Sequence, residues 1–504
     1  MSHCKKMPMP PDQVMLFAQS VDESLSRNSD VRFVGEAMDL LDWSAMETTR
    51  RAVGCPPYPA RVLCKILVYG YSKGIRSSRA LEDAVGNDKR YIWLAGGLVP
   101  DHSTISRFRK DRYRELKAIY AETVRLCAEA GLVLLKTTST DGTKIASRAS
   151  MRSFYDAKRL DRESEAIEQI LREAEEVDGQ EDEMYGSGKP GELPDDLVDK
   201  KARLSKLSEL AAKLKESGRS HISSTDERAH LMKTSAGIRP AYNVQLTVDS
   251  AESVIVAADV TTNETDNGQL AGQLEQVVEN VGLRPDVALG DTGYSDERTF
   301  GYLESTGQEA IIPPRRQPQE RKRNDLFASK CFLKEDGQDA LICPAGRRLK
   351  FYRQAKCSSG TYREYRASGC RSCSLRDGCV GTRWTNSRRI QISTMAEQRQ
   401  KMFDKLATDE GRGLYALRRQ TVEPVIGNIK WNMGLDRFVL DGKEGTSSET
   451  WLACAAHNLM IYVRKAASGA RTLLSALTWV ADWAAMRYYG DFHLNSRGPA
   501  QLLD

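Results

Sequence analysis

The chain has 504 residues, of which 40% are hydrophobic and 28% are charged, and its formal net charge is +5. This length is too great for one compact core and predicts two to four domains. No run reaches the roughly 18 apolar residues of a membrane span. The start also lacks the apolar core of a signal peptide, so we expect a cytoplasmic protein without a membrane partner.

Charge is distributed unevenly along the chain. Residues 173–196 carry ten acidic side chains and one Lys, whereas residues 345–389 carry twelve Arg or Lys and two acids. Aromatic residues are interspersed among these basic side chains, a mixture that suits contact with a phosphate backbone. The alternative is an ordinary solvated basic face.

The first 130 residues have helical patterns. "PARVLCKILVYGYSKG" has helical apolar spacing, and "PDHSTISRFRKDRYREL" places a capping Asp or Ser before a helix with polar and basic early residues. A helix of this kind after shorter helices is typical of a DNA reader that presents its N-terminal residues to the major groove. The candidate recognition residues are Ser103, Thr104, Arg107 and Arg109. A plain helical bundle with a basic face fits the pattern equally well.

From residue 132 the pattern changes to alternating strands and helices. "LVLLKTTSTDGTKI" reads as a buried strand that ends at Asp141-Gly142, and "RPDVALGDTGY" as a short strand that ends at Asp291. "AYNVQLTVDSAESVIVAADVTT" reads as two strands, and "NGQLAGQLEQVVENVGL" as an amphipathic helix. This alternation predicts an α/β sheet over residues 132–314, interrupted by a polar helical hairpin.

Three acids stand out as candidates for metal chemistry. Asp141 and Asp291 each follow a predicted strand, so both meet at one edge of the sheet if those strands are neighbours. Carboxylates suit hard divalent cations, and two such ions can flank a phosphodiester. Glu423, among Arg418, Arg419 and Lys430 on a predicted helix, is the third candidate. The simpler alternatives are Asp-Gly turns and a surface ion network.

A fourth acid, Asp266, precedes the predicted helix of "NGQLAGQLEQVVENVGL". An N-cap is its simpler role. The alternative is a supporting role beside the metal ligands or a contact with DNA. Trp431, beside Lys430, reads either as a core residue or as a side chain that stacks on a base.

Several motifs in order give the chain a specific resemblance. "PDHSTISRFR", "TDGTKI", "AYNVQLTVD", "ALGDTGY", "YALRRQTVEPVIGNIKWNMGLDRF" and "AAHNLMIYVRK" resemble successive segments of bacterial insertion-sequence transposases of the DDE class. The resemblance runs from about residue 55 to residue 465 and includes the family's Tyr-Arg-Glu-Lys signature region.

The resemblance implies a ribonuclease H-like catalytic core in which Asp141, Asp291 and Glu423 bind two Mg²⁺ ions, or Mn²⁺ in their place. It also implies that Tyr415, an arginine and Lys430 bind DNA phosphates. Arg418 fits the signature's distance from Tyr415, whereas Arg419 fits its distance to Glu423, so the choice between them stays open.

The expected fold class is therefore α/β, with four regions. These are an all-α DNA-binding domain (1–130), a ribonuclease H-like domain (131–314 plus 396–465) with a helical hairpin insertion (157–220), a basic Cys-rich insertion (315–395) and a C-terminal helical tail (466–504).

Six of the eleven cysteines fall between residues 331 and 379. Four of them, Cys343, Cys370, Cys373 and Cys379, include a Cys-x₂-Cys pair and are candidate ligands of a structural Zn²⁺. Reduced, partly buried thiols are the alternative, and Cys357 is a spare fifth candidate.

The function that the resemblance implies is DNA transposition. The protein would bind double-stranded DNA at the terminal inverted repeats of its element, cut each end, and join the freed 3′-hydroxyl to target DNA. A homodimer on DNA is expected, because both ends must be paired. The alternatives are a nuclease without strand transfer and an inactive repeat-binding protein.

Overall fold

The computed structural model describes residues 20–47, 58–185, 195–315, 327, 331–335, 337–357, 360–380 and 387–468. All but the first residues of the tail predicted at 466–504 lie outside these ranges. None of the helices within them combines the length and the apolar character that a bilayer crossing requires.

The N-terminal region of the chain is helical. The side chain of Asp101 accepts a hydrogen bond from the backbone of Thr104 and so begins α5, and the left-handed Gly96 ends α4. The helices are α1 (Asp30–Asp39), α2 (Ala60–Ser72), α3 (Ser78–Asn87), α4 (Lys89–Ala95), α5 (His102–Asp111) and α6 (Tyr113–Glu129).

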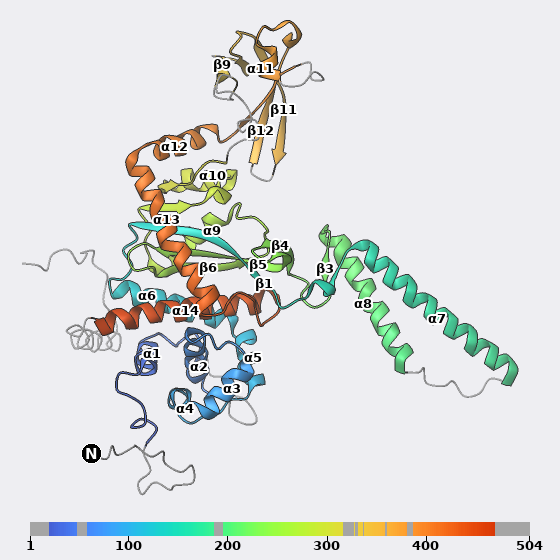
Figure 1. Ribbon diagram of the computed structural model, residues 1–504, viewed down its shortest axis with the longest axis vertical. Helices are drawn as coiled ribbons and strands as arrows, with labels where there is room; N and C mark the ends of the chain where they lie inside the picture. The colour runs from blue at the N-terminus through green and yellow to red at the C-terminus, as the bar shows by residue number, and fades with distance from the viewer. Residues whose placement is uncertain are drawn as a thin grey trace, which may run out of the picture.

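A mixed sheet of six strands forms the centre of the molecule (Figure 1). Strand β1 pairs in parallel with β7 and antiparallel with β5; β5 also pairs with β6 and β4, and β7 with β8. Helices α9 (Gln269–Val281) and α10 (Glu297–Thr306) follow β6 and β7. The strands are β1 (Thr137–Ala146), β4 (His230–Thr234), β5 (Gly237–Asp249), β6 (Ile255–Thr261), β7 (Val287–Gly290) and β8 (Ala310–Ile311).

Strand β1 is longer than its sequence predicts. The predicted end at Asp141-Gly142 is wrong, because the strand continues to Ala146 and pairs along that length with β5. The ladder to β5 outweighs the turn preference of the Asp-Gly pair. Strand β7, in contrast, ends at Gly290, so Asp291 begins the loop as predicted.

The C-terminal helices connect the sheet to the N-terminal helices. Helix α12 (Ala396–Ala407) leads into α13 (Asp409–Gly427), which continues through Pro424 into a π-helical turn (Asn428–Asn432). Helix α14 (Gly442–Ser468) then runs between the sheet and the N-terminal helices, packing against α2, α6 and β6 (Figure 1). Small buried side chains line the middle of this helix, so its neighbours can pack closely on both sides; they are Ala453, Cys454, Ala455 and Ala456.

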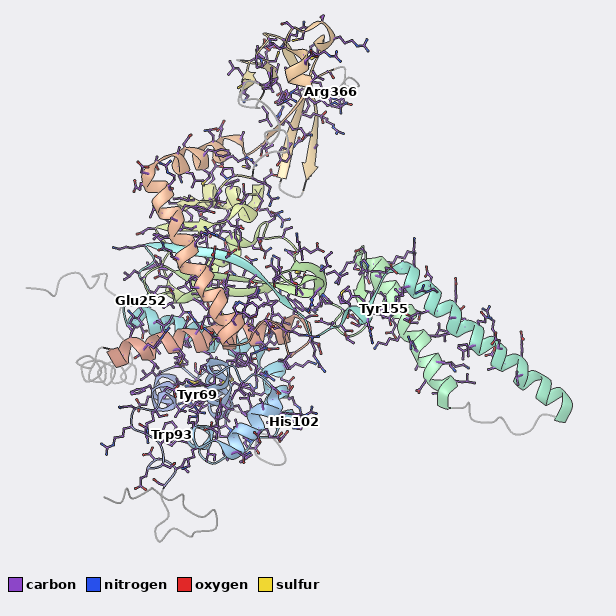
Figure 2. The ribbon with its side chains drawn as sticks, viewed as in Figure 1. Tyr69, Trp93, His102, Tyr155, Glu252 and Arg366 are labelled. Atoms are coloured by element: carbon purple, nitrogen blue, oxygen red, sulfur yellow. The ribbon has the colours of Figure 1, made fainter. Side chains whose placement is uncertain are left out.

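Two segments extend from this central body. Helices α7 (Ala157–Tyr185) and α8 (Asp195–Ser217) form a hairpin that projects far from the sheet (Figure 1). At its base, β2 (Phe154–Tyr155) pairs with β3 (Ile222–Ser223). Figure 2 labels Tyr155 at this base, where the Arg159 guanidinium lies 4.3 Å from its ring centre.

The second segment is an antiparallel sheet with its own small core (Figure 1). It contacts the central body where Glu297 of α10 accepts hydrogen bonds from the backbone and hydroxyl of Thr361 at 2.9 and 3.0 Å. Its elements are β9 (Leu333–Lys334), β10 (Ala340–Ile342), β11 (Arg348–Cys357), β12 (Gly360–Ala367), α11 (Arg376–Val380) and β13 (Arg389–Ser393).

A buried polar network joins α14 to the N-terminal helices. Glu449 is fully buried and accepts hydrogen bonds from the backbone of Val439 and Leu440, both at 2.7 Å, and from Arg76 at 3.0 Å. The hydroxyl of Tyr71 donates to the same carboxylate and accepts from Arg109. Burial raises the pKa of Glu449, while the nearby Arg109 and Arg76 lower it.

This network corrects one prediction. Arg109 was expected to contact DNA, but its side chain is completely buried. Its guanidinium donates to the carbonyl of Arg76 and to the hydroxyls of Tyr71 and Ser78. Arg109 therefore holds helices together instead of facing a duplex.

Glu449→Ala is expected to lower the free energy of unfolding by about 3–5 kcal/mol, because it leaves Arg76 and Arg109 as buried cations without their carboxylate. Chemical denaturation measures the change. The control is Glu444→Ala on the same helix, whose half-exposed ion pair with Arg228 is worth at most about 1 kcal/mol. Equal losses for the two variants would contradict the role of the buried network.

Candidate active site

Strands β1 and β7 place two aspartates side by side. The strands are parallel neighbours, and Thr140 is aligned with Gly290, so Asp141 and Asp291 come next at the same level of the sheet. The side chain of Asp291 accepts a hydrogen bond from the backbone of Gly293 at 2.7 Å, which fixes the turn after β7. The expectation that the two strands are neighbours is confirmed.

Asp141 lies in an environment that disfavours its charged form. Burial is the largest cause that raises its pKa, to about 6, and the charges of Asp291 and Asp266 raise it further. Arg418 acts in the opposite direction and lowers this pKa. The contact with Arg418 therefore does not compensate fully for the burial of Asp141 and for the acids beside it.

Helix α13 packs across β1 and β5 and brings the third predicted acid to this edge. Arg418 is almost buried; its Nη2 donates to Asp141 Oδ2 at 2.8 Å, and its Nη1 lies 3.8 Å from Glu423 Oε1. A single guanidinium therefore bridges Asp141 and Glu423, whose side chain is 49% exposed.

The two candidate arginines differ sharply in position. Arg419 is 80% exposed and lies 3.6 Å from Glu423, one turn along the helix surface. Arg418 points inward and contacts Asp141 directly. Of the two, Arg418 is the one that belongs to the cluster of carboxylates.

The remaining signature residues differ in their electrostatic surroundings. Burial raises the pKa of Tyr415; Arg418 lowers it, and Asp291 and Asp141 raise it further, so Tyr415 is near enough to feel the charges of the cluster. Lys430 lies in the π-helical turn (Asn428–Asn432) and not on α13 itself. Burial lowers the pKa of Lys430, and the charge that opposes this shift is that of Asp436, not of an acid in the cluster.

Asp266 does not take the simpler role that its position before a helix predicts. It is not the N-cap of α9, because Gly268 holds that position and its N–H donates to Asp296 at 2.8 Å. The Asp266 side chain turns instead toward Lys144, Asn243 and Gln245. The polar residues Asn243 and Gln245 inside the otherwise apolar strand "AYNVQLTV" were the signal that a polar site lies there.

The residues of this cluster have the chemical groups that bind a metal ion, but their side chains are not arranged around a common point. Across the residues that the structure describes, no group of three or more His, Cys, Asp or Glu side chains is arranged to hold a metal ion. The cluster nevertheless has the type of donor that a hard divalent cation prefers, because its oxygens are those of carboxylates. Arg418 is the cation that Asp141 contacts in the present arrangement.

Four cysteines gather away from this site, in the antiparallel sheet. Cys343, Cys370, Cys373 and Cys379 line one small pocket, and none of them forms a disulfide. The Cys343 sulfur accepts from the Arg347 backbone at 3.3 Å, and the Cys370 sulfur from the Arg388 backbone at 3.5 Å. The side chain of Cys357, the spare candidate, lies outside the described residues.

The predicted recognition helix presents only some of the residues expected. Arg107 is exposed, as is Ser103, while Thr104 is half-buried. The hydroxyls of Ser103 and Thr104 both donate to Asp101, so they contribute to the cap of α5. Figure 2 labels His102 on the outer side of these helices, where its ring contacts Glu82 at 2.9 Å.

In the antiparallel sheet of β9 to β13, aromatic rings lie close to arginine side chains. The Arg366 guanidinium, labelled in Figure 2, lies 3.2 Å from the ring centre of Tyr352, and Arg363 lies 4.8 Å from that of Phe351. Arg366 also pairs with the buried Glu364.

Trp431, in the π-helical turn after α13, is 72% exposed, which excludes the core role considered for it.

Two segments of the chain match models of known protein families. A protein-family model described as "Transposase DDE domain" matches residues 342–463, a segment that contains α12, α13 and most of α14 and therefore Arg418 and Glu423. Asp141 and Asp291 lie outside the matched residues. A second model, "Transposase domain (DUF772)", matches residues 19–111, the helices α1 to α5. A search of curated proteins returned no match.

Both matches are to transposase domains, and they occupy the two ends of the chain in the order of the motifs above. Together these two matches support an insertion-sequence DDE transposase.

Proposed function

We propose that this transposase cuts DNA at the terminal inverted repeats of its element and joins the freed ends to target DNA, using Asp141, Asp291 and Glu423. One observation carries the proposal. Asp141 and Asp291 lie at the same level of neighbouring parallel strands, and Arg418 connects Asp141 to Glu423 of α13.

The order of the central strands supports a ribonuclease H-like core. Reading across the sheet, β6, β5 and β1 are antiparallel neighbours, and β7 and β8 continue in parallel with β1. In this arrangement the acid within β1 and the acid after β7 meet at one edge. The domain division proposed is the one expected from the sequence, with the helical domain (residues 1–130) and the basic insertion (residues 315–395) as the DNA-contacting regions.

Within this proposal the chain's own residues bind and orient the DNA. Asp141, Asp291 and Glu423 would hold two Mg²⁺ ions, which supply charge stabilisation to the attacking and leaving oxygens at phosphorus. Arg418, already placed between two of the acids, would neutralise the charge of the reacting phosphate. Arg419, which is exposed, would contact flanking phosphates, as would Lys430 and Tyr415.

In this proposal one site catalyses two successive reactions at phosphorus. In the first, water attacks the phosphodiester at the end of the element, and the bond to the 3′-oxygen breaks to release a 3′-hydroxyl. In the second, that hydroxyl attacks a phosphodiester of the target strand, which releases the target's own 3′-oxygen and forms the new joint. A homodimer that pairs two element ends would supply one such site for each end.

Two alternatives differ from this proposal in their products. A nuclease without strand transfer would release free 3′-hydroxyl ends and never join them to a target. A repeat-binding protein without catalysis would retain the DNA uncut. The presence of all three acids with Arg418 between two of them favours a catalytic protein over the inactive alternative.

Asp141→Ala, Asp291→Ala and Glu423→Ala should each reduce cleavage of labelled terminal repeats on the order of a thousandfold, because metal-assisted charge stabilisation is worth several kcal/mol. The assay contains Mg²⁺ and a supercoiled target, and gel electrophoresis separates cut from joined products. Repeat binding should remain within a few-fold of that of the unchanged protein.

The matched control is Asp409→Ala on α13, whose side chain is 99% exposed. It should keep both cleavage and joining. If a variant of one of the three acids retains full cleavage, that acid is not part of the site. If the unchanged protein cuts DNA but forms no joined product, the nuclease alternative is favoured.

Asp141→Asn is expected to stabilise the metal-free protein at neutral pH. A carboxyl whose pKa rises from 3.8 to about 6 on folding contributes stability below pH 3.8 that is lost as the pH rises through about 6. Each pKa unit corresponds to about 1.4 kcal/mol, so the variant should gain about 2–3 kcal/mol at pH 7.5 and only about 0.5 kcal/mol at pH 4.

Denaturant unfolding in the presence of a chelator, at both pH values, measures this gain. Asp409→Asn serves as the control with no expected gain. A loss of stability in Asp141→Asn at pH 7.5 would show that the contact with Arg418 outweighs the cost of burying the charge.

The proposal extends to a structural Zn²⁺ held by Cys343, Cys370, Cys373 and Cys379. Its support is that four thiols from three separate segments line one pocket, and that backbone N–H groups donate to two of the sulfurs. Such donors stabilise the thiolate form in which cysteine binds zinc.

Metal analysis of protein purified without added zinc should therefore find about one Zn²⁺ per chain. Cys370→Ser and Cys373→Ser should lose the metal and the stability of the sheet around it, whereas Cys331→Ser, outside the pocket, should keep both. Zinc-free protein that unfolds at the same denaturant concentration with and without added zinc would refute the site.

A further inference from the structure

The carboxylate of Asp266 lies between the two glycines that follow the predicted catalytic aspartates. A Cβ built on Gly142 would lie 2.2 Å from Asp266 Oδ1. A Cβ built on Gly293 would lie 2.7 Å from Asp291 Oδ1 and 3.2 Å from Asp266 Oδ2. A side chain at Gly142 would collide with Asp266, whereas one at Gly293 would collide with Asp291 and only crowd Asp266, so the two aspartates lie close together beside Gly293.

One oxygen of Asp266 is fixed by three donors. Oδ1 accepts from Lys144 Nζ at 3.1 Å, from Asn243 Nδ2 at 2.8 Å and from Gln245 Nε2 at 2.7 Å. Gln245 is itself held, because the buried hydroxyl of Tyr294 donates to its Oε1. These donors come from β1 and β5, so the orientation of the carboxylate is set by the sheet that carries Asp141.

The other oxygen is turned toward the acids. Oδ2 takes part in none of these three hydrogen bonds and lies on the side of Gly293 and Asp291. A carboxylate that needed only an ion pair with Lys144 could make it at the surface, away from like charges. Instead Asp266 lies close enough to raise the pKa of Asp141. One oxygen held by hydrogen bonds and one turned to the neighbouring acids is the usual arrangement of a carboxylate metal ligand.

We infer that Asp266 is a fourth carboxylate of the site and a ligand of the divalent cation held by Asp141 and Asp291, with Lys144, Asn243 and Gln245 as its positioning residues. The inference rests on the proposed function for the presence of that cation. It adds a residue that the family's three-acid signature does not include.

The test is Mn²⁺ binding by the DNA-free protein, followed by the electron paramagnetic resonance of free Mn²⁺. Asp266→Asn keeps the shape of the side chain and removes its charge, and it should weaken Mn²⁺ binding at least about tenfold, as Asp141→Asn and Asp291→Asn should. The matched control is Glu264→Gln, an exposed acid two residues earlier in the same loop, which should bind Mn²⁺ as the unchanged protein does.

A second variant tests the positioning of Asp266 without a change of charge. Asn243→Ala removes a neutral donor to Asp266 Oδ1 and leaves every charged group in place, so it should weaken Mn²⁺ binding about tenfold. If Asp266 were not a ligand, this variant would leave the Mn²⁺ affinity unchanged. The second variant keeps the inference testable if Asp266→Asn does not fold.

The outcomes distinguish a failure of the Asp266 inference from a failure of the proposed function. Loss of binding in Asp141→Asn and Asp291→Asn, with binding by Asp266→Asn within twofold of the unchanged protein, would overturn the role of Asp266 and leave the proposed function intact. A wild-type protein that binds no Mn²⁺ would overturn both.

Discussion

The parallel pairing of β1 with β7 imposes the main electrostatic constraint on this protein. It sets Asp141 and Asp291 at one level of the sheet, where burial and the neighbouring acids disfavour the charged form of Asp141. Arg418 reaches in from α13 to contact Asp141 and offsets part of this cost. The approach of Asp266, which the absence of a side chain at Gly142 allows, adds to the cost, and Asp266 has donors of its own. Perturbed carboxyl pKa values of this kind are common at functional sites.

Helix α14 determines how the site connects to the rest of the molecule. It is buried between the sheet and the N-terminal helices, and Glu449 ties its first turns to Arg76 and, through Tyr71, to Arg109. One continuous hydrophobic core therefore includes residues from α1 to α6, the sheet and α14. Because buried charges keep their partners only in one geometry, this network favours a fixed orientation of the N-terminal helices relative to the carboxylates. A DNA contact by those helices would then be positioned relative to the site of cleavage.

The two projecting segments are not part of this continuous core. The hairpin of α7 and α8 and the antiparallel sheet with four cysteines each have a small core of their own. Small cores stabilise little by themselves, so each segment depends on additional contacts. The hairpin has its short strand pair and the stack of Arg159 on Tyr155. The sheet contacts α10 through Glu297, and its thiols offer a place for a stabilising metal.

The sequence by itself determined the alternation of strands and helices, the place of Asp291 after a strand, and the helix that carries Glu423, since each follows from local periodicity and turn residues. The order of the transposase motifs is also a property of the sequence alone. Only the tertiary structure decided that β1 runs through Asp141, because a long partner strand outweighed an Asp-Gly turn. It likewise decided that Arg418 rather than Arg419 faces the acids, that Arg109 is buried, and that Asp266 joins the carboxylates. These outcomes depend on which residues distant in sequence meet in space, and local patterns carry no information about that.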